Sequence, residues 1–276
     1  MAFYFQKISD YGTSSPFVTR TSFQANRLME PFPFEKKRKE EIFGILHSKV
    51  LPHLVACAGI VESIADDVGK IREEVKKEGI EMQSQGRVVT VPSVMNLEAK
   101  VETYLYNAKL VLRDITGLFL PFWGKQFNHS RYDKILKWSE ERFGDKHELT
   151  QMLRSDQNWI KRVVTMRNAV EHPGTPDTLN VKNFQVKKFG NSIVLTEPTW
   201  WLNQEKPVPI IKEMDILIWN MLGFQEDLLV IFLQTIDVKM PFAFSFVEIP
   251  ESKRDPQCPM RLQIVWNTSN RGDNHN

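Results

Sequence analysis

Cysteine is scarce in this sequence. The 276-residue chain has only Cys57, in an apolar helical context, and Cys258, between prolines in a polar stretch. Two such residues do not supply a disulfide framework, which favours a reducing compartment. The chain contains no Cys-x-x-Cys pair, and its six histidines lack zinc-ligand spacing. We therefore expect no metal and no cofactor.

An excess of charge of one sign is also missing. The chain has 36 basic and 34 acidic side chains, for a net charge of +2. Dedicated nucleic-acid binders usually carry a clustered basic excess. The overall charge therefore gives no case for a nucleic-acid partner, although a local basic site remains compatible with it.

The sequence has no long uninterrupted apolar run. Residues 1–20 lack a basic start followed by an apolar stretch, so we expect no signal peptide. The most apolar window, 210–236, is interrupted by the polar residues Asp215, Asn220, Gln225, Glu226 and Asp227. Carboxylates are costly in lipid, so this window predicts a buried helix rather than a membrane span. We expect a cytoplasmic protein without a membrane partner.

Helical periodicity covers most of the remaining chain. Residues 1–34 show no clear period and predict an irregular arm. A helix is expected from 35 to about 78, with a kink at Pro52, and a second from Asn96 to near Pro121. A shorter helix is expected around 132–142.

A third main helix is expected to begin near Lys146 and to end around Pro173, because the residue before a proline resists the helical conformation. The alternating runs 184–187 and 192–196, separated by Gly190-Asn191, predict a hairpin. A fourth helix over about 209–236 and two further strands, 242–249 and 261–266, complete the pattern.

These elements predict a mainly α fold. We expect about four main helices in one domain over 35–266, a small β insertion at about 180–200 after the third helix, and extra strands after the fourth. The polar tail 267–276 is expected to be disordered. We do not divide residues 35–266 into further domains, because neither strand pair buries a core alone.

Polar residues with chemical potential gather on the third helix. At about 3.6 residues per turn, Asp156 and Arg167 fall on its apolar stripe. An arginine on such a stripe needs a partner or a wet cavity. Asn168 and His172 lie four residues apart on the neighbouring face, with His172 at the helix end. A structural role is the alternative: Arg167 pairing with an acid on another helix, and His172 interacting with the helix C-terminus.

The stretch Arg167-Asn168-Ala169-Val170-Glu171-His172 resembles the signature of HEPN proteins, which is an arginine, a polar residue, a few further residues and a histidine. In that family the signature lies near the end of the third helix of a four-helix bundle. The match covers one helix closely and the order of helices loosely. The arm, the hairpin and the last strands lie outside the minimal family bundle.

The resemblance implies an endoribonuclease that cleaves single-stranded or looped RNA without a metal. Arg167 and His172 would be catalytic, with Asn168 and Asp156 in support. An arginine fork suits a phosphate, and a histidine moves protons near neutral pH. The family pairs two motif helices, so a homodimer is implied, in a prokaryotic toxin or defence setting with an antitoxin or nucleotidyltransferase-like partner.

A different class of function is the alternative. The chain would then be a non-catalytic HEPN-like module that binds a partner protein or a nucleotide, with Arg167 as a binding or structural group. Glu171 beside His172 and the modest net charge favour this alternative. The run Thr199-Trp200-Trp201-Leu202 predicts aromatic packing of strands on the fourth helix, with a base-stacking platform as its second interpretation.

Overall fold

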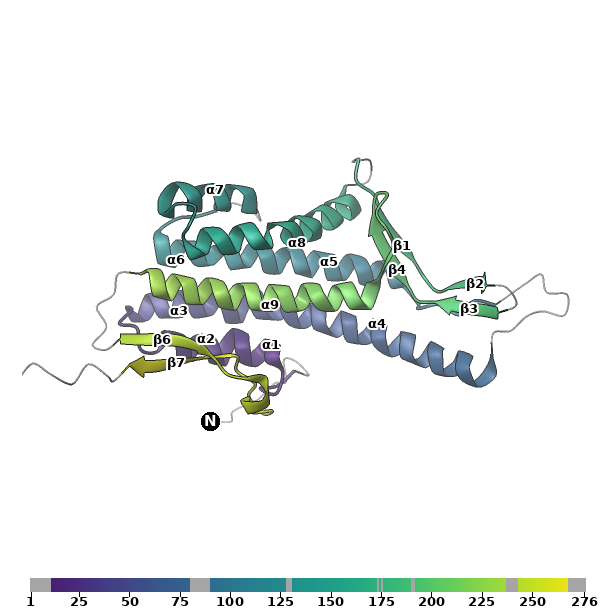
Figure 1. Ribbon diagram of the computed structural model, residues 1–276, viewed down its shortest axis with the longest axis horizontal. Coiled ribbons are helices and arrows are strands. Elements are labelled where there is room, and N and C mark those ends of the chain that lie inside the picture. Colours follow the sequence, from purple (N-terminus) through teal and green to yellow (C-terminus); the bar gives the residue numbers. More distant parts are fainter. Residues whose placement is uncertain are drawn as a thin grey trace, which may run out of the picture. The chain divides into compact units, whose positions relative to one another are not determined.

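The chain is mainly helical with small antiparallel sheets (Figure 1). The structure is a computed structural model, and it describes residues 11–79, 90–127, 131–172, 174, 176–189, 192–236 and 243–267. Contacts between residues divide the chain into two compact units. Unit 1 comprises Met1–Val55, Val111–Ser155 and Met221–Asn276, and unit 2 comprises Ala56–Leu110 and Asp156–Asn220.

Long helices alternate with short helical segments and short strands along the chain. The helical segments are α1 (Pro16–Val18), π-helical η1 (Thr19–Gln24), α2 (Ala25–Met29), α3 (Lys36–Gly44), π-helical η2 (Ile45–Val50), α4 (Leu51–Glu78), α5 (Leu97–Ile115), 3-10 helical η3 (Thr116–Leu118), α6 (Phe119–Trp123), α7 (Tyr132–Phe143), α8 (Glu148–Glu171), α9 (Ile210–Thr235) and 3-10 helical η4 (Glu251–Lys253). The strands are β1 (Leu179–Lys182), β2 (Gln185–Phe189), β3 (Ser192–Thr196), β4 (Thr199–Leu202), β5 (Val208–Pro209), β6 (Ala243–Glu248) and β7 (Leu262–Asn267).

The division into units falls inside long helices. Each of α4, α5, α8 and α9 contributes residues to both units. The sequence predicts one domain over residues 35–266. No linker separates the two units, because a helix runs through each boundary between them. Each unit is assembled from segments that are distant in sequence.

The order of main helices agrees with the sequence prediction. Helical structure runs without interruption from Lys36 to Glu78 through α3, η2 and α4. Pro52 has no N–H to offer the carbonyl of Ser48, four residues earlier. The helix widens to π geometry over Ile45–Val50, which ends two residues before the proline. The expected disturbance at Pro52 therefore takes the form of a π-helical segment.

The expected irregular arm over 1–34 is wrong for Pro16–Met29, which is helical. Pro16 occupies the first helical position, where a missing N–H costs nothing. The buried side of this segment includes polar residues, among them Arg20 and Gln24. Because polar residues occupy buried positions, this part of the sequence lacks the apolar periodicity that indicates a buried helix.

A carboxylate buried in unit 1 explains how these polar residues are accommodated. The Glu226 side chain of α9 is 1% exposed. It accepts hydrogen bonds from Arg20 Nε at 2.8 Å and from Gln24 Nε2, and Arg261 Nε lies 3.2 Å from its second oxygen. Gln24 in turn accepts the backbone N–H of Leu262 at 2.7 Å. The cluster joins the N-terminal helix, α9 and β7.

The strands after α8 form two small antiparallel sheets. One has the order β1-β4-β5, and the other is the hairpin β2-β3. The hairpin was expected, and its Gly190-Asn191 turn lies outside the described residues. Trp200 of β4 is fully buried, packs against Tyr104 and donates its indole N–H to Glu213 of α9. This confirms the packing interpretation for Trp200 and excludes it as an exposed stacking platform.

The strands after α9 pair as expected. β6 and β7 form an antiparallel ribbon in which Phe244 lies opposite Trp266. The ribbon includes Asn267, the first residue of the expected disordered tail, and 268–276 lie outside the described residues.

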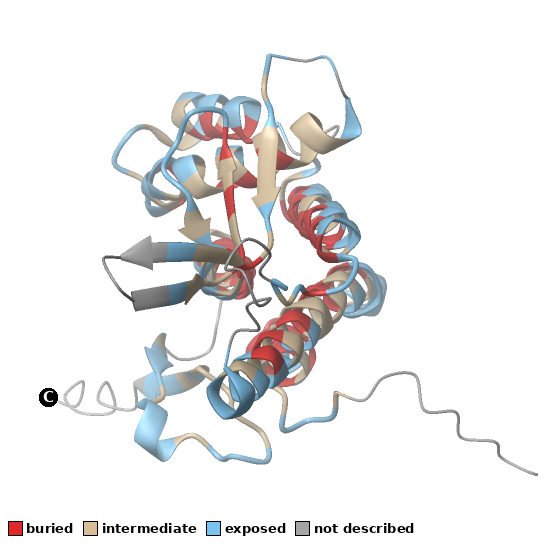
Figure 2. Ribbon diagram, turned by 90° about the vertical axis from the view of Figure 1, so that its right-hand side faces the viewer, coloured by how far each residue is buried: buried red, intermediate tan, exposed pale blue. Residues whose placement is uncertain are grey.

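Burial follows one side of α4, α5 and α8, and the opposite side of these helices is exposed (Figure 2). In α9, by contrast, no residue from Met221 to Leu233 is exposed. Two helical stretches, Lys36–Glu78 and Ile210–Thr235, are long and apolar enough for a membrane span by length and composition. Core helices pass the same test. In the second stretch 61% of the apolar window is buried, as expected of a core helix.

We predict that Glu226→Ala lowers the free energy of unfolding by about 3–5 kcal/mol, because it leaves two mostly buried arginines without their shared carboxylate. Chemical denaturation followed by circular dichroism measures this change. Glu74→Ala, at an exposed position of α4, is the control and should stay within about 0.5 kcal/mol of wild type. Equal effects of the two substitutions would contradict the structural role of Glu226.

Candidate functional site

The six residues 167–172, hereafter the α8 motif, form the last turns of α8 and the residue after it. α8 ends at Glu171, two residues before Pro173 in the sequence, and Gly174 follows with a φ of 101°. The backbone N–H of His172 still donates to the carbonyl of Asn168 at 2.9 Å. The whole motif belongs to unit 2, as do Tyr106 and Lys109 of α5.

Glu171 holds two cations together. Its Oε2 lies 3.1 Å from Lys109 Nζ and 3.8 Å from Arg167 Nη2. Lys109 also donates to Asn168 Oδ1 at 3.0 Å. Hydrogen bonding and charge from Lys109, followed by the positive charge of Arg167, lower the pKa of the Glu171 carboxyl below its ordinary value. The end of α8 is therefore tied to α5 by a lysine that the sequence did not single out.

Arg167 is mostly shielded from solvent, as its place on the apolar stripe predicted. Its side chain is 14% exposed, and its guanidinium carbon lies 5.6 Å from the ring centre of Tyr106. Its Nε atom is buried and has no hydrogen-bond partner among the described residues. The acid that pairs with Arg167 lies one turn along the same helix, not on another helix as the structural alternative proposed.

His172 is exposed. Within the described part of the chain its side chain has no hydrogen bond or ion pair, so its imidazole is available to a ligand or a second protein. Its charge contributes to the lowered pKa of the neighbouring Glu171, although less than Lys109 and Arg167 do. No described contact joins the side chains of His172 and Arg167.

Asp156 does not belong to this cluster. It precedes Arg167 by eleven residues on one helix, or about 16 Å at 1.5 Å per residue. Its carboxylate instead accepts the indole N–H of Trp159 at 2.7 Å. The structure thus brings together Arg167, Asn168 and Glu171, with His172 next to them, and leaves Asp156 apart.

A cavity of about 400 Å³ lies beside the motif. Ala169 and Val170 contribute to its wall, but Arg167 and His172 do not. Its charged lining residues, Glu98, Glu102 and Asp177, are all acidic. An anionic ligand is therefore unfavourable inside this cavity.

Among the residues that the structure describes, no three or more His, Cys, Asp or Glu side chains are grouped so that they could hold a metal ion.

Tyr106 and Lys109 are the site residues that sequence reasoning missed. They lie three residues apart on α5 and thus share one face of that helix. Tyr106 is 50% exposed on this face. The sequence contains no signal that directs this face of α5 to the end of α8.

No family model, curated protein or solved structure matches this chain. The likeness to the HEPN signature therefore stays a prediction from the α8 motif.

We predict that Lys109→Gln raises the pKa of the Glu171 carboxyl back toward its ordinary value, because Lys109 is the largest cause of its depression. A carboxyl with a depressed pKa stabilises the fold above its unfolded-state pKa and loses that contribution as the pH falls through its folded-state pKa. An NMR titration of the labelled Glu171 carboxyl carbon measures the shift. The same substitution at the exposed Lys161 is the control. An unchanged Glu171 titration in Lys109→Gln would contradict the contact.

Proposed function

We propose that this chain is a metal-independent endoribonuclease of the HEPN type, acting on single-stranded or looped RNA in the cytoplasm. One observation carries the proposal: an Arg-Asn-x-x-x-His motif ends α8, with Arg167 shielded and His172 exposed within one helical turn of Glu171. The order of long helices, α4, α5, α8 and α9, is compatible with a four-helix bundle whose third helix carries the motif.

The proposed reaction needs only groups that the chain supplies. The RNA 2′-oxygen loses its proton to a base and bonds to the adjacent phosphorus. The bond from phosphorus to the 5′-oxygen breaks, and that oxygen takes a proton. The products are a 2′,3′-cyclic phosphate and a 5′-hydroxyl. His172 moves a proton near neutral pH, and Arg167 stabilises the charge that develops on the phosphate.

The contacts around Glu171 suggest how the phosphate would be held. Arg167 and Lys109 share one carboxylate oxygen. A phosphate offers the same charge-assisted acceptors, so it can replace Glu171 as their common partner. Asn168, which accepts a hydrogen bond from Lys109, positions that ammonium. The exposed ring of Tyr106 would stack a base of unpaired RNA.

A second copy of the chain would complete the site. In one copy, the α8 motif supplies one shielded arginine, Arg167, and one exposed histidine, His172. The described contacts do not bring these two side chains together. Two copies that meet at their α8 motifs would place two arginines and two histidines along one cleft. We therefore propose a homodimer through the end of α8.

A non-catalytic binding module is the second candidate. Arg167 already contacts Glu171 and Tyr106, and the cavity beside the motif is acidic. These features favour a partner with a basic group, such as a protein surface, over a substrate phosphate.

We predict that Arg167→Ala and His172→Ala each reduce RNA cleavage by about a hundredfold or more, because each removes a group that acts on the transition state. Cleavage by wild type should persist in excess chelator. Gel analysis of end-labelled RNA measures both effects. Arg154→Ala and His47→Ala are matched controls away from the motif and should cleave like wild type. Cleavage unchanged in both motif variants would reject the proposed mechanism.

We also predict that cleavage per chain falls on dilution, because a site made by two copies is lost when they separate. Activity measured over a thousandfold range of protein concentration, at least about 1 nM to 1 μM, tests this. Light scattering gives the molecular mass of the protein at the highest concentrations of this range. A purely monomeric protein that is active at every concentration would exclude the composite site.

A further inference from the structure

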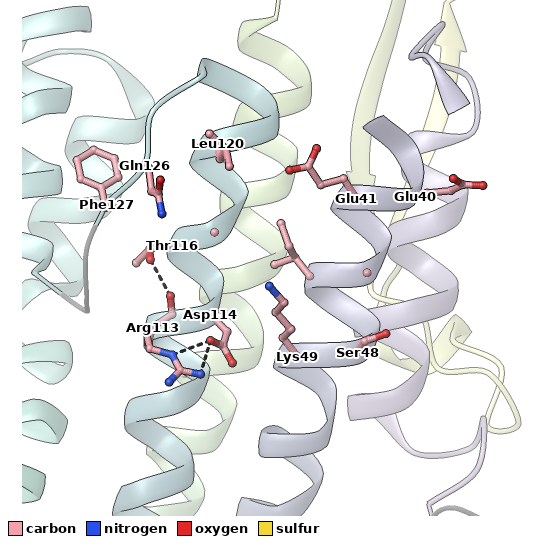
Figure 3. A pocket seen from close by; sticks show the side chains of 13 residues that line it. Glu40, Glu41, Ser48, Lys49, Arg113, Asp114, Thr116, Leu120, Gln126 and Phe127 are labelled. Atoms are coloured by element: carbon pink, nitrogen blue, oxygen red, sulfur yellow. Dashed lines mark hydrogen bonds and ion pairs between the residues drawn. The ribbon is translucent and has the colours of Figure 1, made fainter. Parts of the chain in front are cut away.

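A second cavity, in unit 1, lies between two helical segments and far in sequence from the α8 motif. It measures about 630 Å³ and forms a groove between α3–η2 on one side and the end of α5 with η3 and α6 on the other (Figure 3). Gly44, Ile45, Gly117 and Leu120 contribute its apolar lining, and Leu120 is 44% exposed. Ile45 is 7% exposed, so the exposed apolar surface of the groove comes mainly from Leu120, with Gly44 and Gly117 partly exposed.

Gly44 leaves unused space in this groove. A Cβ atom built at Gly44 has no heavy atom within 4 Å, apart from its own helix and chain neighbours, so the fold does not need a glycine there. Gly44 also has no positive φ, and glycine inside a helix is less stable than alanine. At Gly117, by contrast, a Cβ atom would meet the Ile45 side chain at 3.6 Å. The open side of Gly44 suits the close approach of another backbone.

Opposite charges lie at the two ends of the groove. Glu41 reaches toward it from one end and Lys49 from the other (Figure 3). Neither forms a salt bridge in the described part of unit 1. Arg113, near Lys49, is instead neutralised by Asp114, with its Nε 2.8 Å from Oδ1. Glu41 and Lys49 therefore flank the glycine on one helix without a salt bridge, and Glu41 interacts electrostatically with Arg38.

The positions of these charges are related by symmetry. Glu41 and Lys49 are each four residues from Ile45, which is adjacent to Gly44. If two copies of this helix cross antiparallel at that point, Glu41 of each copy meets Lys49 of the other. We propose that this groove is a contact between two copies of this chain, with a two-fold axis at Ile45 and two Glu41–Lys49 ion pairs. Such a contact is self-complementary, as a two-fold interface requires.

This inference does not depend on the proposed ribonuclease activity. The groove belongs to unit 1 and the α8 motif to unit 2. A chain that used both contacts would assemble beyond a dimer, so the total mass does not identify this contact. Disulfide formation between two copies of a cysteine placed near the two-fold axis detects this contact directly.

The first experiment is oxidation of Gly44→Cys in the full chain, with Cys258→Ser to remove the half-buried native thiol. In the proposed dimer the two copies of residue 44 are offset by only about 3 Å along the helices, which permits a disulfide. Lys37→Cys is the control, since its two copies are about 24 Å apart along the helices. We expect covalent dimers from the first variant and none from the second.

Charge reversal tests the register. Glu41→Lys and Lys49→Glu should each weaken cross-linking by roughly tenfold, because each places like charges together at both ends of the contact. The double variant restores opposite charges and should cross-link like the parent. Gly44→Ala, followed by thermal unfolding, checks that residue 44 tolerates a side chain.

Two results would overturn the proposal. One is cross-linking of Gly44→Cys that does not exceed that of Lys37→Cys in folded protein, which would leave the groove to a different partner. The other is a double charge variant that cross-links as weakly as the single variants, which would exclude the antiparallel register.

Discussion

Two arginines and a glutamine surround the buried carboxylate of Glu226, and this cluster fixes three separate segments of unit 1. It places the N-terminal helix against α9 and holds the beginning of β7 through Gln24. A carboxylate with 1% exposure is stable in such a place only with charged and hydrogen-bonding partners around it. Arg20 and Gln24 are therefore buried because Glu226 is, and the position of the N-terminal segment follows from one residue of α9.

The same chemistry recurs near the surface in unit 2, where its consequence differs. Glu171 also joins two cations, but its side chain is 39% exposed. Solvent weakens such ion pairs, so they contribute little to stability and their partners can be exchanged. A buried carboxylate fixes a fold, whereas the exposed carboxylate of Glu171 holds Lys109 and Arg167 by contacts that, in our proposal, another anion replaces. This contrast is the reason that we propose a binding role for the α8 motif, although Glu226 has the denser network of hydrogen bonds and ion pairs.

Much of the helical framework could be predicted from the sequence, because apolar residues at helical spacing mark α4, α5, α8 and α9. The hairpin and the final strand pair were predicted from alternation and from turn residues. The N-terminal helix was missed because its buried side includes Arg20 and Gln24, which resemble exposed residues in the sequence. At the candidate site, the shielding of Arg167 followed from its place on the stripe. The contacts of Lys109 and Tyr106 did not, because they depend on packing between helices that are about sixty residues apart.

We propose above all that the α8 motif promotes attack of an RNA 2′-hydroxyl on the adjacent phosphorus. The most direct measurement uses a short RNA whose cleavage position has been mapped and a second RNA that differs only by 2′-deoxy substitution of the nucleotide before it. We predict cleavage of the first, with a 2′,3′-cyclic phosphate and a 5′-hydroxyl at the new ends, and no cleavage of the second at that position. Equal cleavage of both RNAs would contradict the claim.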